Sequence, residues 1–204
     1  MANVNVAFGL KPINNAGSTP ATGGTNAYLI ASNASAIYQG SAVKAVNGGS
    51  IAIGSASGDT VAFVGVFAGC EYVSSTTGKK VFSNFWPGSG ADTNFDIIGR
   101  VYDNPLQRFL VCTDATFTNQ ATAEAAIFEN SQFNSGAGGS TTTGISNAQL
   151  DVATLDSSNA SLPLKIVGIG TDADNEDYAA AGLPVIVMIN NHALLQADSE
   201  AAIS

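Results

Sequence analysis

Residues able to do acid–base, nucleophilic or zinc chemistry are few in this chain and stand apart. His192 is the only histidine, and no cysteine cluster or nearby aspartate supports Ser-His-Asp or zinc chemistry around it. Gly168-Ile169-Gly170 follows an apolar run but lacks the third glycine and the helix of a dinucleotide site. Nucleophile-elbow, Walker A and His-Glu-x-x-His motifs are absent from the sequence. We therefore expect no enzyme activity, no catalytic residues, no resident metal and no cofactor.

The acidic loop at residues 172–177 is the place where carboxylates cluster most densely in the sequence. It contains Asp172, Asp174, Glu176 and Asp177, and such residues can bind calcium through their oxygens. An EF-hand beginning at Asp172 would need Gly at its sixth position and Glu at its twelfth, but those positions hold Asp177 and Leu183. Two interpretations stay open: an exposed acidic turn and a looser calcium site.

The charge balance excludes two classes of partner. The chain has 204 residues, with 7 Lys and Arg against 16 Asp and Glu, a net charge of -9 and a pI near 4.2. DNA and RNA binding depends on clustered basic residues that replace condensed counterions, and Lys79-Lys80 is the only adjacent basic pair. An acidic surface does not suit anionic lipid, and no run approaches the ~20 apolar residues of a membrane span. We expect neither nucleic acid nor membrane as a partner.

Cysteine usage and the N-terminal residues indicate where the chain is made. The first residues lack the basic region and the apolar core of a secretory signal. Cys70 and Cys112 are too few for a disulfide framework, and each stands inside an apolar run. We expect both to be buried free thiols, and the chain to be synthesised in a reducing cytoplasm.

Short β-branched runs separated by turn residues predict an all-β fold. Two runs, residues 164–169 and 185–189, carry apolar side chains at odd and even positions, so both faces of each strand need cover. Asn47-Gly48 between apolar runs predicts a hairpin. Residues 121–129 are Ala-rich and free of Gly and Pro, which predicts one short helix with Asn119 as its N-cap. We expect a β-barrel-like or sandwich domain over residues 25–204, preceded by an extended N-terminal arm at residues 1–24.

Four apolar residues are candidates for contact with another subunit or partner. The prolines of the arm oppose a continuous helix, and Phe8 and Leu10 would expose apolar area unless a partner covers them. We therefore expect the arm to order on a neighbour, with Phe8 and Leu10 as its anchors. Ile186 and Met188 lie in a run that needs cover on both faces, and we expect each to face the core or a subunit contact.

Three blocks of sequence carry a resemblance. They are residues 7–13 (Ala-Phe-Gly-Leu-Lys-Pro-Ile), residues 138–151 (Gly-Gly-Ser-Thr-Thr-Thr-Gly-Ile-Ser-Asn-Ala-Gln-Leu-Asp), and residues 162–168 (Leu-Pro-Leu-Lys-Ile-Val-Gly) followed by 187–192 (Val-Met-Ile-Asn-Asn-His). In this order they are similar to head decoration, or cement, proteins of tailed bacteriophages and cyanophages, which are encoded near the major capsid protein. The blocks together span nearly the whole chain.

This resemblance implies a β-barrel-like virion protein that binds the outer surface of the capsid and stabilises it. The implied partner is the major capsid protein, the implied assembly is a homotrimer, and no catalytic residues come with the family. The implied location is the capsid exterior after synthesis in the host cytoplasm, and the acidic pI suits that surface better than the DNA-facing lumen. The alternative is a host-attachment or receptor-binding virion protein, a fibre or surface adhesin, for which exposed aromatic clusters and repeats are expected.

Overall fold

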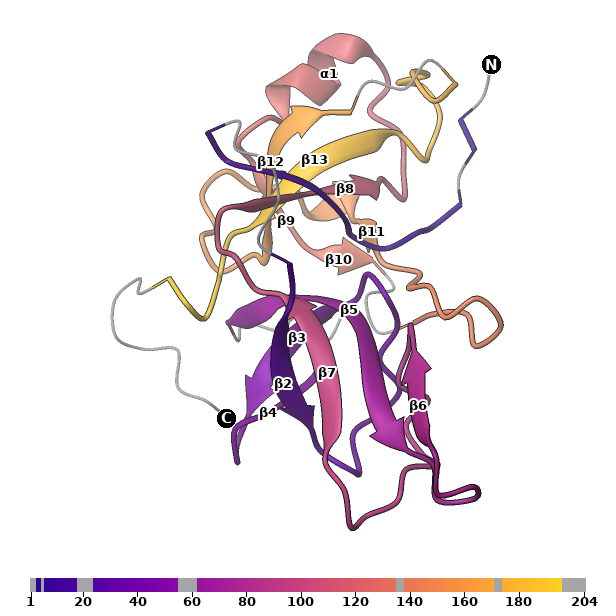
Figure 1. Cartoon of the computed structure of the whole chain (residues 1–204). Helices are drawn as coiled ribbons and strands as arrows, with labels where there is room; N and C mark the ends of the chain where they lie inside the picture. The colour runs from indigo at the N-terminus through magenta and orange to yellow at the C-terminus, as the bar shows by residue number, and fades with distance from the viewer. Residues whose placement is uncertain are drawn as a thin grey trace.

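The structure is a computed structural model that describes residues 3–4, 6–17, 24–54, 62–134, 138–170 and 174–195. Within these ranges the regular elements are β1 (Lys11–Asn15), β2 (Asn26–Ile30), β3 (Ala42–Val46), β4 (Ser50–Ile53), β5 (Phe63–Val73), β6 (Lys80–Ser83), β7 (Ile97–Tyr102), β8 (Gln107–Cys112), α1 (Gln120–Ala125), β9 (Asn130–Ser131), β10 (Phe133–Asn134), β11 (Gln149–Leu150), a 3-10 turn (Val152–Thr154), β12 (Leu164–Ile169) and β13 (Pro184–Ile189). The predicted all-β fold with one short α-helix is confirmed, and two lobes are visible (Figure 1).

The barrel lobe is a closed five-stranded sheet built from β2, β3, β4, β5 and β7. The strand order is β3-β4-β2-β7-β5, and β3 also pairs with β5, which closes the ring; β6 extends the sheet from β5. Closure removes most of the unpaired strand edges that an open sheet would expose. The Asn47-Gly48 hairpin is confirmed, since it joins β3 to β4 and Gly48 adopts a φ of 91° that this turn requires.

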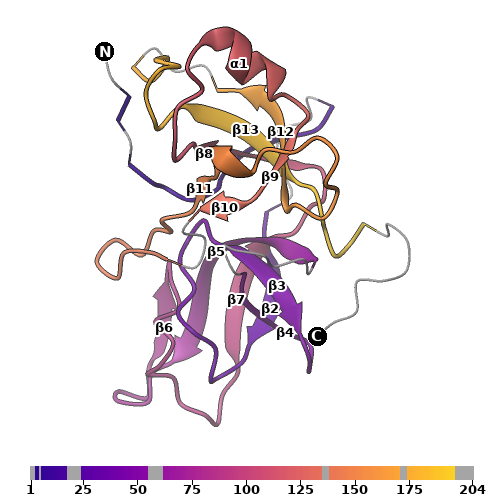
Figure 2. The ribbon, with the colours of Figure 1, turned by 180° about the vertical axis from the view of Figure 1, so that it is seen from behind.

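The sheet lobe contains the second half of the chain together with β1. Its five strands run in the order β1-β8-β13-β12-β9, and β10 and β11 form a separate short pair beside them (Figure 2). The predicted strands at residues 164–169 and 185–189 are confirmed as the antiparallel pair β12 and β13. After β13 the chain returns to the barrel, where His192 forms a bridge with Phe63 of β5.

Strand β1 corrects the expectation for the N-terminal arm. Lys11 lies opposite Leu110 and Pro12 opposite Phe109, so residues 11–15 form the edge strand of the chain's own sheet. Pro12 has no N–H to donate, and an edge strand tolerates this. The arm does extend a sheet, as strand addition requires, but the sheet belongs to the same chain. The expectation that this part orders on a neighbour is therefore wrong, while residues 18–23 lie outside the described residues.

Helix α1 begins as predicted and ends earlier. The Asn119 N-cap is confirmed: the Thr122 backbone N–H donates to Asn119 Oδ1 at 3.0 Å, and the Asn119 N–H donates to Thr122 Oγ1 at 3.2 Å. The helix was expected over residues 121–129 but ends at Ala125. The reason lies in Phe128, which adopts a φ of 78° and donates its N–H to the Ile166 carbonyl oxygen at 2.8 Å, so the chain turns from the helix onto β12.

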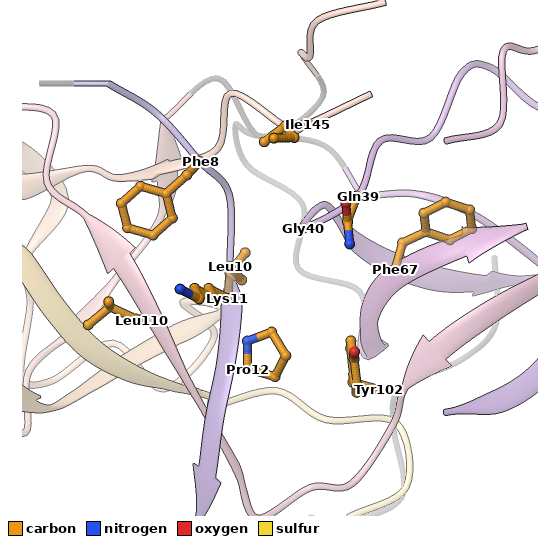
Figure 3. A pocket seen from close by; sticks show the side chains of 10 residues that line it. All are labelled: Phe8, Leu10, Lys11, Pro12, Gln39, Gly40, Phe67, Tyr102, Leu110 and Ile145. Atoms are coloured by element: carbon orange, nitrogen blue, oxygen red, sulfur yellow. The ribbon is translucent and has the colours of Figure 1, made fainter. Parts of the chain in front are cut away.

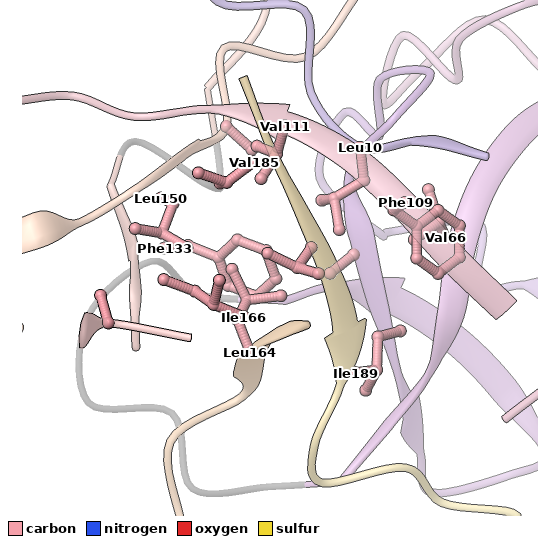
Figure 4. Packing of buried hydrophobic residues seen from close by; sticks show 14 of the residues in the cluster. Leu10, Val66, Phe109, Val111, Phe133, Leu150, Leu164, Ile166, Val185 and Ile189 are labelled. Atoms are coloured by element: carbon pink, nitrogen blue, oxygen red, sulfur yellow. The ribbon is translucent and has the colours of Figure 1, made fainter. Parts of the chain in front are cut away.

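Two clusters of buried apolar side chains form the core. One fills the barrel lobe around Val43, Phe67 and Val101. The other lies against the inner face of the sheet lobe and also includes Phe63 and Val66 from the barrel (Figure 4). Its members pack from β8, β12 and β13, as the labelled side chains show. The two lobes therefore share buried apolar contacts instead of meeting only through polar surfaces.

Candidate partner-binding surface

Residues 3–4 and 6–10, here called the N-terminal segment, are joined to the barrel lobe at Gly40. The Leu10 N–H donates to the Gly40 carbonyl oxygen at 2.9 Å, and the Gly40 N–H donates to the Phe67 carbonyl oxygen at 2.9 Å. Gly9 adopts a φ of +68°, and a Cβ at this position would stand 2.8 Å from the Gly40 oxygen. Only glycine allows the two backbones to come this close.

The other end of the N-terminal segment is bound to the loop between β12 and β13. Asn3 Nδ2 donates to the Asp177 carbonyl oxygen at 2.8 Å, and the Asp177 N–H donates back to Asn3 Oδ1 at 2.9 Å. The Val4 N–H donates to Asn175 Oδ1 at 2.8 Å. Between these anchors the Cys112 thiol donates to the Val6 carbonyl oxygen at 3.7 Å, so the segment passes over the end of β8. Both ends of the segment are thus fixed within the chain.

The N-terminal segment nevertheless presents apolar side chains to solvent. Val4 and Val6 are 64% and 62% exposed, although each belongs to a residue type that is usually buried. Phe8 is half-buried and is one wall of an apolar pocket. This ordered segment, with two exposed valines beside an apolar pocket, is a candidate for contact with another macromolecule.

The pocket beneath Phe8 has a volume of about 470 Å³ and lies where the N-terminal segment meets the barrel lobe (Figure 3). Its lining residues are Phe8, Leu10, Lys11, Pro12, Gln39, Gly40, Phe67, Tyr102, Leu110 and Ile145. Lys11 carries the one full charge among them, and Gln39 and Tyr102 supply the other polar side chains. The rest of the lining is apolar, so the pocket can accept apolar side chains.

The structure brings the four predicted contact residues to neighbouring places but gives them different roles. Leu10 is 2% exposed and belongs to the core of its own chain, so the expectation that it anchors the arm on a partner is wrong. Phe8 lines the pocket, and its contact with a partner stays a prediction. Ile186 and Met188 are half-buried on the face of β13 that points away from the core, while Val185 and Val187 point into it.

The face of the sheet lobe that points away from the core combines apolar and basic residues. We call it the outer face and define it by six residues: Lys11, Arg108, Leu110, Lys165, Ile186 and Met188. Strand register sets this face, because Lys11 lies opposite Leu110, Leu110 opposite Ile186, and Met188 opposite Lys165. Sequence reasoning missed its basic residues, although alternation with apolar neighbours in their strands was the signal that could have found them. The far wall of the pocket gave no local signal, because Gln39, Phe67 and Tyr102 come from separate segments.

Both cysteines are buried free thiols, as predicted. Burial raises the pKa of the Cys70 thiol to about 12 and also raises the pKa of Cys112. Cys70 lies in β5 of the barrel and Cys112 in β8 of the sheet lobe. A thiol with a raised pKa is a poor nucleophile and a poor metal ligand, so neither cysteine suggests chemistry.

His192 is buried in the turn that follows β13. Its Nδ1 accepts the Leu194 backbone N–H at 3.1 Å, and its Nε2 is buried without a hydrogen-bond partner. Burial lowers the pKa of His192, and the negative charge of Asp103 opposes that shift. Backbone hydrogen bonds hold the C-terminal turn against β5: the Phe63 N–H donates to the Asn191 carbonyl oxygen and the Ala193 N–H donates to the Phe63 carbonyl oxygen, each at 2.8 Å.

The described residues contain no group of three or more His, Cys, Asp or Glu that could hold a metal ion. Asp172 lies outside them, so the calcium interpretation of residues 172–177 stays untested. No helix in the described ranges is long and apolar enough to cross a membrane. Comparisons with family models, with curated proteins and with solved structures found no match.

Proposed function

We propose that this chain is a virion structural protein that binds the outer surface of a bacteriophage capsid and stabilises it without catalysis. The partner is the major capsid protein, and the assembly is a homotrimer. The observation that supports this proposal is the N-terminal segment, which exposes Val4 and Val6 beside Phe8 and its apolar pocket. The resemblance of residues 7–13 and two later blocks to capsid decoration proteins supplies the identity of the partner.

The segment is well suited to binding because its backbone is already ordered. Hydrogen bonds at Asn3, Val4 and Leu10 fix it, so docking costs little further conformational entropy. Complete burial of one valine side chain stabilises by roughly 1.5–3 kcal/mol. Two valines and the free face of Phe8 therefore support a contact that is modest for each copy. Because a decoration protein occupies many equivalent capsid sites and binds assembled shells, small gains at each site add up by linkage.

The charge of the chain supports the exterior of the particle as its location. The net charge is -9, and packaged DNA would repel such a surface.

Binding to expanded capsids that lack the protein tests the proposal. We expect the wild-type chain to sediment with such capsids in a saturable way. Val6→Asp should raise the dissociation constant at least about tenfold, which corresponds to about 1.4 kcal/mol. Leu29→Asp is the matched control, since Leu29 is also an exposed apolar residue but lies on the barrel lobe, and it should bind like wild type. Absence of wild-type binding, or equal loss in both variants, would overturn the proposal.

Host attachment is the second candidate function, and one observation favours it. Phe82 and Phe95 of the barrel lobe are 74% and 56% exposed, and exposed aromatic residues are typical of adhesive surfaces. Lys80 stands over the Phe82 ring at 5.4 Å and also pairs with Glu71, so the ring is held in place at the surface. A Phe82→Ala virion that adsorbs to host cells as well as wild type would exclude this function for the barrel surface.

A further inference from the structure

The outer face of the sheet lobe is apolar at its centre and incompletely covered. Leu110, Ile186 and Met188 are half-buried there, whereas Phe109 and Val187 on the inner face are fully buried. The N-terminal segment lies over the end of this face, where the Cys112 thiol donates to Val6 and where Phe8 lines a pocket together with Leu110. The side chains nearer the start of β12 and the end of β13 therefore keep part of their apolar area open to a partner.

The charge of this face is opposite to that of the chain. Strands β1, β8, β12 and β13 carry Lys11, Arg108 and Lys165, three of the 7 basic residues, and none of the 16 acidic ones. In the described part of the chain these three form no ion pair, whereas Lys80 and Arg100 both pair with Glu71.

Arg108 also has an unused donor. Its Nε is buried and lacks a hydrogen-bond partner within the described residues. Because the chain itself covers Nε, a partner can reach only the rest of the half-buried guanidinium, whose nitrogens form no hydrogen bond or ion pair in the described part of the chain. Across neighbouring strands, Met188 lies opposite Lys165, Lys165 opposite Asn130, and Asn130 opposite Asp156. The carboxylate of Asp156 already accepts hydrogen bonds from the backbone N–H and the hydroxyl of Ser158. A carboxylate from a partner is the group that this face lacks.

The chain carries a matching acidic surface at the far end of the same hairpin. Asp174 and Glu176 are exposed in the loop that follows β12. Lys165 stands near the start of β12, and the four residues from there to Ile169 span roughly 13 Å. Hydrogen bonds from Asn3 and Val4 hold the loop at its own end of the sheet. One copy therefore does not bring its acidic loop onto its own Lys165 and Arg108.

We infer that the outer face binds residues 174–177, the described part of the acidic loop, of a second copy of this chain. Glu176 of one copy lies against Lys165 and Arg108 of the next, and the open apolar area of Ile186 and Met188 is buried beneath the neighbour's loop. The two surfaces differ, so the contact is head-to-tail; such contacts form a ring when the rotation between copies closes and an open filament when it does not. That the oligomer contains three copies rests on the proposed function. The pairing of the outer face with the neighbour's loop does not.

Sedimentation velocity of the purified chain tests this interface without any capsid. We expect a closed oligomer at about 50 mM salt that dissociates at about 500 mM, because screening weakens pairing between exposed charges. Lys165→Glu and Glu176→Lys should each lower the association constant at least about tenfold, and the double variant should recover to within about threefold of wild type. Lys79→Glu is the matched control, since Lys79 is an exposed lysine of the barrel lobe, and it should leave association unchanged.

Three outcomes would overturn the inference. They are a wild-type chain that stays monomeric up to about 100 µM, an oligomer that Lys165→Glu leaves intact, and single variants whose defects add in the double variant. Failure of the proposed function is separable from these outcomes. A chain that forms the oligomer but ignores capsids would refute capsid decoration and keep the interface, whereas a monomer that binds capsids would do the reverse.

Discussion

Leu10 donates its backbone N–H to the carbonyl oxygen of Gly40 at 2.9 Å, and this bond joins the sheet lobe to the barrel lobe. On one side of Leu10 the chain continues into edge strand β1, and on the other side it becomes the exposed N-terminal segment. The side chain of Leu10 is buried in the core at the same point. Leu10 therefore sets the position of the exposed valines relative to both lobes.

Gly9→Ala should destabilise the fold by more than the cost of placing a non-glycine residue in the left-handed region. A non-glycine residue in the left-handed region costs roughly 1–2 kcal/mol, and the added Cβ at position 9 also meets the Gly40 oxygen, which adds about 1–3 kcal/mol. Gly17→Ala is the control, because Gly17 has a φ of +82° with open space around it. Urea unfolding of both variants should show the larger loss for Gly9→Ala; equal losses would mean that the close approach contributes nothing.

Leu10→Ala should lower the free energy of unfolding by roughly 2–5 kcal/mol, because it opens a cavity in the shared core. Val6→Ala should change it by less than about 0.5 kcal/mol, since Val6 is mostly exposed. Deletion of residues 2–12 should then lower the melting temperature, contrary to what an unattached arm would predict. Calorimetry of the three proteins checks this, and a truncated chain that melts like wild type would contradict the position of Leu10.

The free energy of unfolding should decrease as the pH is lowered, because protonation of His192 disfavours the folded state. Burial lowers its folded-state pKa below the ordinary value of 6.5, so the neutral form is favoured in the fold. The stabilising contribution is fully present above pH 6.5 and is lost as the pH falls through the folded-state pKa. Protonation also removes the Nδ1 acceptor of the Leu194 N–H. Melting temperatures measured from pH 7 downward should fall less steeply for His192→Asn, and identical slopes for the two proteins would exclude this role.

Cys70 should resist alkylation in the folded chain. A thiol pKa of about 12 in place of 9.0 lowers the thiolate fraction at neutral pH about a thousandfold. Iodoacetamide should therefore label Cys70 slowly until denaturant is added, and mass spectrometry of unreduced virions should find no bridge between Cys70 and Cys112. Rapid labelling under native conditions would show that the barrel lobe opens there.

Local patterns predicted the elements whose cause is local. The Asn119 cap, the Asn47-Gly48 turn and the β12–β13 hairpin each depend on residues close in sequence, and all three are present. The apolar residues at odd and even positions of β13 predicted that both faces need cover; in the structure Val185 and Val187 are buried, while Ile186 and Met188 are half-buried.

Pairing between distant segments could not be predicted in this way. The pairing of Lys11 with Leu110 joins residues about a hundred positions apart, and the barrel closes through the non-adjacent strands β3 and β5. Half-buried Phe8 and buried Leu10 look alike in sequence, because only the fold decides which apolar residue of the arm turns fully inward.

The most direct test of capsid decoration compares the resistance of particles with and without the protein to heat and to low salt. Particles that lack it should keep their geometry but release DNA at lower temperature or lower salt, and added wild-type chain should restore them while Val6→Asp should not. If such particles are equally robust and instead fail to adsorb to host cells, capsid stabilisation is refuted and host attachment takes its place.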